Sequence, residues 1–273
     1  MALPGFIRHT VRGVANTPVI GKALRSIVKG RLRMSFRWQH PIDRFYGIDT
    51  SGVMQNNEIV ADRELARKIS CYMGIQPSIV RRSLGALTSP GDYAFIDLGC
   101  GKGRLTVVAS EFPFHSITGI EISPKLADIA ARNAAIIGAK FPPRTKINII
   151  AGDAVDFPVT GRRLVLYIYN SFGPELMEQL LKNIERHLEQ NQIDHLFLVY
   201  HHPVSGAVFD RSKALKRWFA AEFPADPEEK NYGLERESAT VIWQSIKNAC
   251  PDRHAGAGRS ILLNDKKETS LGA

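Results

Sequence analysis

Between about residues 93 and 200 the chain alternates short, continuous apolar runs with longer segments of helical periodicity. Short apolar runs are typical of buried strands, and apolar residues at every third or fourth position are typical of amphipathic helices. Their alternation predicts an α/β fold that is doubly wound, with a mostly parallel sheet and helices on both of its faces. The predicted strands are 94–98, 116–121, 146–150, 164–169 and 195–200, and the predicted helices between them are 103–111, 124–137 and 174–189.

The pattern differs on either side of this alternation. Two helices are expected before it, and an antiparallel pair of strands that closes the sheet is expected after it. These four elements have the ranges 58–72, 78–87, 216–223 and 240–245. The last residues are polar, contain glycine and lack apolar periodicity, so we expect them to form a loose tail. The expected organisation is an N-terminal arm at 1–54, a single domain at 55–246 and a tail at 247–273.

The positive charge of the chain is concentrated in the arm. The chain holds 36 Lys and Arg against 27 Asp and Glu, a formal net charge of +9. Residues 1–42 contain eight of the basic residues and no acid, which leaves 28 basic against 27 acidic residues, a net charge of +1, for the rest. The overall basicity therefore says little about the partners of the domain itself. The eight residues are Arg8, Arg12, Lys22, Arg25, Lys29, Arg31, Arg33 and Arg37.

Within the arm, residues 19–37 have the pattern of an amphipathic basic helix. Apolar residues fall on one side of the helical wheel, and lysine and arginine fall on the other. Such a helix can contact an anionic membrane or a nucleic acid, or it can pack its apolar side on the domain and leave its charges in water. An arginine-rich segment without acids is also typical of organelle transit peptides. The apolar positions are Ile20, Leu24, Ile27, Val28 and Leu32.

The composition excludes several classes of protein. With 44% hydrophobic and 23% charged residues, we expect a globular chain rather than a disordered one or a multi-span membrane protein. No apolar run is long enough to cross a bilayer, and basic residues interrupt the apolar stretches near Met1, so no secretory signal is expected. Three scattered cysteines, Cys71, Cys100 and Cys250, are too few for a disulfide framework, and we expect a reducing, cytoplasmic location.

The segment from Phe95 to Arg104, FIDLGCGKGR, joins a predicted strand to a predicted helix through a glycine turn. Glycines let a backbone approach a ligand closely, and a helix N-terminus presents free N–H groups. The dinucleotide fingerprint G-x-G-x-x-G is not matched, because Gly103 comes one residue early and Arg104 holds the last glycine position. Asp97, just before the turn, would also repel a pyrophosphate, whereas it suits a cofactor with a cationic amino-acid tail.

This pattern resembles the first motif of class I S-adenosylmethionine-dependent methyltransferases, and the resemblance extends over about residues 93–200. It implies a seven-strand, Rossmann-like sheet with S-adenosylmethionine as the cofactor. Glu121 ends the second strand 20 positions after Gly101, where a carboxylate accepts hydrogen bonds from ribose hydroxyls. By the same resemblance, Asp97 and the turn glycines hold the methionine end, and residues 153–154 flank the adenine. The cofactor residues expected in this domain are Asp97, Gly99, Cys100, Gly101, Gly103, Glu121, Ile122, Asp153 and Ala154.

The tip after the fourth strand, residues 169–175, reads YNSFGPE and is expected to face the transferring methyl group. Methyl transfer is an in-line displacement at a sulfonium, so the enzyme mainly aligns the acceptor and excludes water, and no metal is needed. The side-chain carbonyl of Asn170 is expected to accept a hydrogen bond from an acceptor N–H. Amino-methylating relatives have an Asn/Asp-Pro-Pro-aromatic tetrad at this tip, and the prolines are absent here, which disfavours a nucleic-acid base as the acceptor.

A second, shorter resemblance is to the seven-strand (non-SET) histone lysine methyltransferases. Their Phe-rich tip contains Asn and leads into Gly-Pro-Glu, as do Asn170, Phe172 and residues 173–175 here. They also have a loop with Tyr-Gly and Thr-Ser ahead of the cofactor domain. Residues 46–51, YGIDTS, are similar to that loop. This resemblance implies a protein lysine or a related amine as the acceptor. It also implies that Tyr46 and Thr50 cover the cofactor.

A lysine acceptor, with an ordinary pKa of about 10.4, must lose its proton in an apolar slot. Tyr46, Tyr169 and Phe172 are expected to line that slot. If the acceptor is instead a hydroxyl, His201 or His202 after the fifth strand is the expected general base. We therefore expect methylation of an amine nitrogen, on a protein lysine or a small amine. The alternatives are a small-molecule O-methyltransferase and a non-catalytic module of the same fold that docks through its basic arm. The expected catalytic residues are Asn170, Phe172 and His201.

Overall fold

The computed structural model of the chain describes residues 39–169, 171–232 and 237–251. The basic helix expected at 19–37, Asn170 and most of the expected tail lie outside these residues. Within the described part, no helix combines the length and the apolar character that a membrane span requires.

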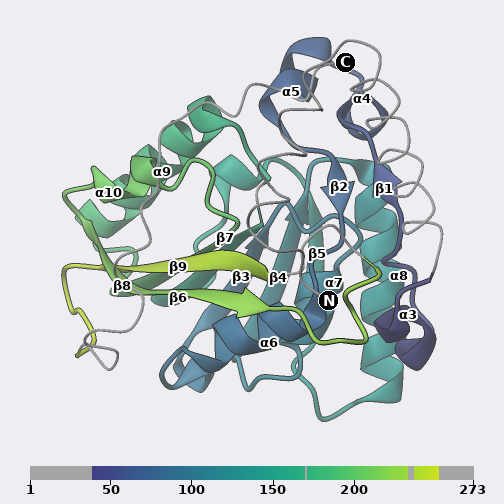
Figure 1. The fold of residues 1–273 in the computed structure, drawn as a ribbon. Helices are drawn as coiled ribbons and strands as arrows, with labels where there is room; N and C mark the ends of the chain where they lie inside the picture. Colours follow the sequence, from purple (N-terminus) through teal and green to yellow (C-terminus); the bar gives the residue numbers. More distant parts are fainter. Residues whose placement is uncertain (1–38, 170, 233–236, 252–273) are drawn as a thin grey trace, which may run out of the picture.

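A seven-stranded mixed sheet forms the centre of the structure (Figure 1). Its order is β5-β4-β3-β6-β7-β9-β8; the first five strands in this order are parallel, and β9 runs antiparallel to both β7 and β8. The predicted fold, a mostly parallel seven-strand sheet with an antiparallel closing strand, is confirmed. The strands are β3 (Ala94–Leu98), β4 (Ser116–Glu121), β5 (Ile147–Ala151), β6 (Arg163–Tyr169), β7 (His195–His201), β8 (Leu215–Pro224) and β9 (Glu237–Ser245).

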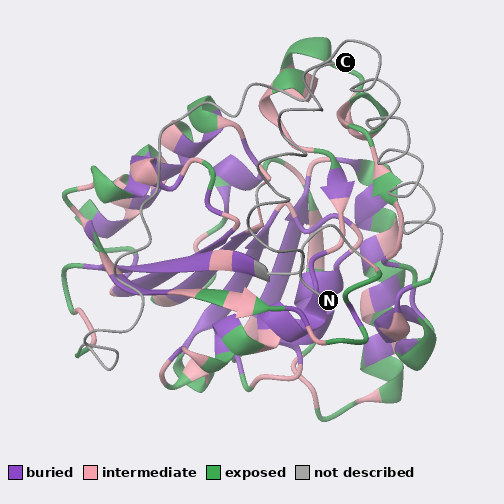
Figure 2. Cartoon of the chain, in the orientation of Figure 1, coloured by how far each residue is buried: buried purple, intermediate pink, exposed green. Residues whose placement is uncertain are grey.

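Strand side chains alternate between two hydrophobic cores, one on each face of the sheet, and the inner strands are buried, whereas the edge strands β5 and β8 are partly exposed (Figure 2). In β3, Ile96 and Leu98 belong to the first core and Phe95 to the second. Helices α9 and α10 pack on the first core, and α6, α7 and α8 on the second. Each fully buried Leu, Ile or Phe side chain contributes about 1.5–3 kcal/mol to the free energy of unfolding. The helices are α6 (Pro77–Gly85), α7 (Arg104–Ala109), α8 (Pro124–Lys140), α9 (Pro174–Glu189) and α10 (Ala207–Asp210), with short 3-10 turns at η1 (Pro90–Asp92) and η2 (Ala154–Asp156).

Helix α8 begins as expected, with Pro124 at its first position, and continues past its expected end at residue 137. Gly138 lies inside the helix, with open space where a side chain would project. The helix ends at Lys140 because Phe141 precedes a proline, and a residue before proline disfavours the helical conformation. The ammonium of Lys140 also donates to the carbonyl of Tyr46 at 2.6 Å.

The prediction of one helix over 58–72 is wrong, because polar side chains divide that segment. Asp62 begins a new helix, its carboxylate accepting a hydrogen bond from the backbone N–H of Leu65 at 2.8 Å. The amide of Asn56 then donates to the carbonyls of Ala66 and Ile69, which occupies the end of that helix. The segment therefore forms α4 (Asn56–Ile59), α5 (Arg63–Lys68) and β2 (Tyr72–Met73), and β2 pairs antiparallel with β1 (Val53–Met54).

Residues at both ends of the expected domain are packed against it. In α3 (Pro41–Tyr46), Ile42 and Tyr46 are buried in the second core together with Ile48, so the expected boundary at 54 and 55 lies within packed structure. At the other end, Gln244 holds the backbone of Cys250, accepting its N–H and donating to its carbonyl.

The buried N-cap of α3 generates a pH prediction. The N–H of Ile42 donates to Nδ1 of His40, so the Nε2–H of the neutral ring donates to Gln76. Burial, together with the nearby Arg104 charge, lowers the pKa of His40 from 6.5 to about 4. The unfolded chain therefore binds the extra proton first, and the free energy of unfolding should fall by up to about 3 kcal/mol between pH 6.5 and pH 4.

His40→Asn should keep the cap, because an Asn carbonyl accepts the same N–H, and remove this titration. Denaturant unfolding of both proteins across this pH range measures the difference between their slopes. Equal slopes in the two proteins would contradict the assignment.

Candidate functional site

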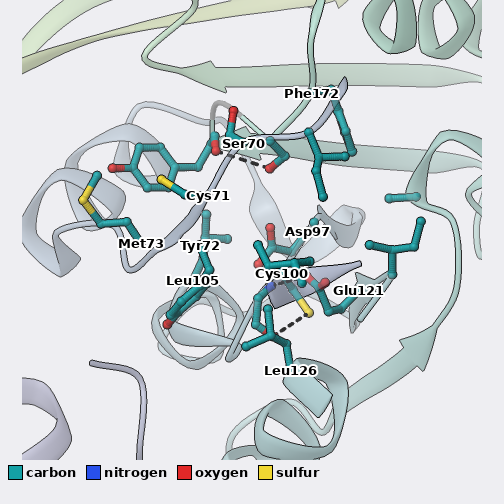
Figure 3. A pocket seen from close by; sticks show the side chains of 18 of the residues that line it. Ser70, Cys71, Tyr72, Met73, Asp97, Cys100, Leu105, Glu121, Leu126 and Phe172 are labelled. Carbon is teal, nitrogen blue, oxygen red and sulfur yellow. Dashed lines mark hydrogen bonds between the residues drawn. The ribbon is translucent and has the colours of Figure 1, made fainter. Parts of the chain in front are cut away.

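A cavity of about 760 Å³ lies at the carboxyl ends of the parallel strands. This is the edge at which open α/β sheets bind ligands. One side of the cavity is formed by the glycine turn after β3 and by the ends of β4 and β6. The other side is formed by the segment from α5 to β2 (Figure 3), which lies over the strand ends in Figure 1.

The turn after β3 is clamped to the neighbouring strand β4. The N–H groups of Gly99 and Cys100 both donate to the carbonyl of Ile120, at 3.0 and 2.9 Å. Gly101 has φ +56, and an ideal β-carbon there would stand 2.3 Å from the ring of Tyr72. The turn therefore requires glycine at position 101, both for its backbone conformation and for the ring that covers it.

Two buried carboxylates, Asp97 and Glu121, lie near Cys100 of this turn (Figure 3). Glu121 accepts hydrogen bonds from the N–H groups of Gly101 and Ser123, at 2.8 and 2.9 Å. Asp97 is 2% exposed, and its Oδ2 has no hydrogen-bond partner among the described residues. Burial raises the pKa of both groups, and the nearby Glu121 charge further raises that of Asp97, well above its ordinary value. An uncompensated carboxylate of this kind favours a cationic ligand.

The other expected cofactor residues fall into two groups. Cys100, Ile122, Asp153 and Ala154 line the cavity, and the carboxylate of Asp153 caps η2 by accepting the N–H of Val155 at 2.9 Å. Gly103 does not line the cavity. An ideal β-carbon at Gly103 would stand 3.2 Å from that of Ala130 in α8, so this glycine lets two helices approach.

The end of the cavity next to the β6 tip is largely apolar. Its backbone is tied to α5: Gly173 N–H donates to the carbonyl of Lys68 at 2.7 Å, and Ser70 N–H donates to the carbonyl of Ser171 at 3.1 Å. Ile69 and Phe172 form the bridge between these two hydrogen bonds. The lining residues here are Ile59, Leu65, Ile69, Tyr169, Phe172, Leu176 and His202.

Three sequence expectations are corrected by where the structure places the side chains. Tyr46 is buried away from the cavity, with its hydroxyl donating to Glu111 at 3.0 Å, so it lines neither the cofactor region nor the slot. Thr50 is also outside the lining, behind Tyr72. His201 is fully buried in β7, where its Nδ1 lies 2.9 Å from the Thr240 hydroxyl, whereas its neighbour His202 lines the cavity.

Sequence reasoning missed the segment from Ser70 to Ile75, every residue of which lines the cavity. The signal was present in the sequence: Gly74 and Pro77 interrupt the helical pattern close to a tyrosine. Among the residues that the structure describes, no three His, Cys, Asp or Glu side chains form a metal-binding group.

Residues 95–191 match a family model described as a methyltransferase domain. No curated protein matches the chain.

Solved structures with a similar fold include an RNA methyltransferase from Salinibacter ruber in complex with S-adenosyl-L-homocysteine. It is 21% identical, with a TM-score of 0.40, over 66% of this chain and 97% of that one. The putative tRNA (m1A22) methyltransferase Sp1610 of Streptococcus pneumoniae is 11% identical, with a TM-score of 0.44, over 63% and 72%. The putative methyltransferase yhhF from Escherichia coli is 16% identical, with a TM-score of 0.43, over 61% and 86%.

The contact between Gly101 and Tyr72 can be tested by stability. Gly101→Ala should lower the free energy of unfolding by about 1–3 kcal/mol, because alanine is strained at this φ and its methyl group displaces the Tyr72 ring. Gly138→Ala is the control: there the side chain enters open space within a helix, and stability should rise by up to about 1 kcal/mol. In a Tyr72→Ala background the cost of Gly101→Ala should shrink, and an equal cost in both backgrounds would rule out the contact.

Proposed function

We propose that this chain methylates an amine nitrogen. Its domain is of the class I S-adenosylmethionine-dependent methyltransferase type. The first candidate is a protein lysine, and the second is a small amine on an aliphatic stem. The observation that carries this proposal is the apolar end of the cavity next to the β6 tip.

The residues of the cavity fit the cofactor. Asp97 Oδ2 is a buried acceptor without a partner, and the ammonium of a methionine tail would supply both a donor and the opposite charge. The two oxygens of Glu121 accept backbone hydrogen bonds from Gly101 and Ser123, and a carboxylate has lone pairs enough to accept a ribose hydroxyl as well. Residues 153–154 lie beside it, where the adenine is expected. When bound, S-adenosylmethionine would supply a methyl group bonded to a sulfonium sulfur, and the methyl carbon is open to in-line displacement.

The apolar end of the cavity favours the neutral form of an amine. Ile59, Leu65 and Ile69 are half-buried, and they line this end of the cavity together with Phe172 and Leu176. Removing an ammonium from water into such surroundings lowers its pKa, and the freed lone pair then attacks. The new N–CH₃ bond forms as the S–CH₃ bond breaks, and the methylated ammonium releases its proton to water. Asn170, adjacent in sequence to this wall, is proposed to orient the acceptor N–H through its side-chain carbonyl.

A second candidate function is O-methylation with His202 as the general base. His202 lines the cavity, and its φ of +54 places it in the left-handed region directly after β7. Such backbone conformations are concentrated at functional sites in non-glycine residues. In this second candidate function the general base is His202 and not His201.

Asp97→Asn tests the cofactor site. Calorimetry should show S-adenosylmethionine affinity weakened about tenfold or more, because a charge-assisted hydrogen bond is lost. In the parent protein the affinity should rise with pH until the raised pKa of Asp97 is passed, because a cation binds the ionised carboxylate. In the variant this rise should disappear.

The melting temperature of Asp97→Asn should not fall with its affinity for S-adenosylmethionine. A carboxyl whose pKa is raised on folding reduces the free energy of unfolding as the pH rises from its ordinary pKa towards the raised one, so Asp97→Asn should hold or increase the melting temperature at pH 8. Asp156→Asn, an exposed carboxylate outside the lining, is the matched control and should change neither property. Unchanged affinity for S-adenosylmethionine in Asp97→Asn would refute the assignment.

The acceptor is tested with S-adenosylmethionine labelled in its methyl group, incubated with the full chain and with protein and small-molecule fractions of a lysate. Label on nitrogen, as methyl-lysine or a methylated amine, is the expected result, and label on oxygen would favour the second candidate. Phe172→Leu should lower kcat/KM about tenfold and leave cofactor affinity within about threefold, because it reshapes the acceptor wall. Phe45→Leu, on a side chain that is 75% exposed in α3, is the control.

A further inference from the structure

We propose that Tyr72 is a cofactor-binding residue that covers the methionine end of the site, and that Thr50 is the positioning residue that holds it there. This inference rests on the proposed cofactor site. It assigns a role to the loop at residues 46–51, which the structure places behind the cavity rather than in it.

The ring of Tyr72 lies directly on the glycine turn. Its Cδ2 and Cε2 atoms are both 2.3 Å from the position that a β-carbon of Gly101 would occupy. The residue also lines the same cavity as Asp97 and Glu121, and all three are labelled in Figure 3. A ligand whose ammonium meets Asp97 therefore lies in the cavity that Tyr72 lines.

Strand β2 has two residues, which is too short to fix this ring by pairing alone. The orientation is set at the other end of the side chain, where the hydroxyl donates to the carbonyl of Thr50 at 2.6 Å. Burial raises the pKa of Tyr72, so the hydroxyl keeps the proton it donates.

Thr50 is itself held from two sides by buried charges. Its hydroxyl donates to Asp43 and accepts from Nε of Arg104 at 2.7 Å, while its N–H donates to Asp43 at 2.9 Å. A threonine hydroxyl offers one donor and acceptor lone pairs, so it can link an acid to a base in this way. Asp43 and Arg104 are 0% and 3% exposed.

Arg104 connects this support to the cofactor helix. It is the first residue of α7, directly after the glycine turn, and its Nη2 and Nη1 donate to the carbonyls of Thr50 and Ile75, at 2.9 and 3.3 Å. Its guanidinium lies against Gly74, where an ideal β-carbon would stand 2.5 Å away. Residues on both sides of Tyr72 are therefore fixed to the helix that starts at the turn.

The test measures binding of two ligands by calorimetry: S-adenosyl-L-homocysteine, and 5′-methylthioadenosine, which lacks the amino-acid end. Tyr72→Phe should weaken the affinity for S-adenosyl-L-homocysteine about threefold to tenfold, the change expected for one hydrogen bond. Tyr72→Leu should weaken this affinity about tenfold or more. Both variants should bind 5′-methylthioadenosine within about twofold of the parent. Thr50→Val should resemble Tyr72→Phe, and Thr50→Ser, which keeps the hydroxyl, should restore binding.

Tyr232→Phe is the matched control, because that tyrosine contacts His40 and Arg44 away from the cavity and should leave both affinities unchanged. Equal losses for the two ligands would show a general structural effect and overturn the inference, as would unchanged S-adenosyl-L-homocysteine binding in Tyr72→Leu. Failure of the parent protein to bind either ligand would refute the proposed cofactor site instead.

Discussion

The site depends on how strand β4 holds the glycine turn that follows β3. Three consecutive N–H groups of that turn donate to β4, two to the carbonyl of Ile120 and one to the carboxylate of Glu121. Because the two strands are parallel neighbours, their carboxyl ends meet at one edge, and the turn cannot shift without breaking these bonds. Helix α7, the Tyr72 ring and the β6 tip are all placed relative to this turn.

Local pattern was sufficient to predict the sheet, and the family resemblance indicated about half of the residues that line the cavity. The bounds of β3 and β4 were predicted to the residue from short apolar runs, and those of α9 from helical periodicity. Asp97 and Glu121 were expected to share a site because of the resemblance to class I methyltransferases, and the structure places both at the carboxyl ends of neighbouring parallel strands. His201 was expected in the cavity, but His202 lines it. The expected strand ended one residue early, and neighbouring strand residues point to opposite faces.

The other half could not be predicted because it is built from single polar contacts between distant residues. Tyr72 and Thr50 are 22 positions apart, and Arg104 and Thr50 are 54 apart. Such pairs leave no periodicity in the sequence. The helix expected over 58–72 is wrong for a related reason. The apolar periodicity continues along the segment, but hydrogen bonds from the side chains of Asn56 and Asp62 divide it into shorter elements.

The walls of the cavity come from two separate stretches of the chain. The match to the methyltransferase family begins at residue 95, whereas ten of the 25 residues that line the cavity lie outside the matched range, nine of them between residues 59 and 75. Changes in that earlier segment can reshape the cavity and leave the sheet, its turn and its two carboxylates in place. A fragment reduced to the matched range would lack a wall of its own binding site.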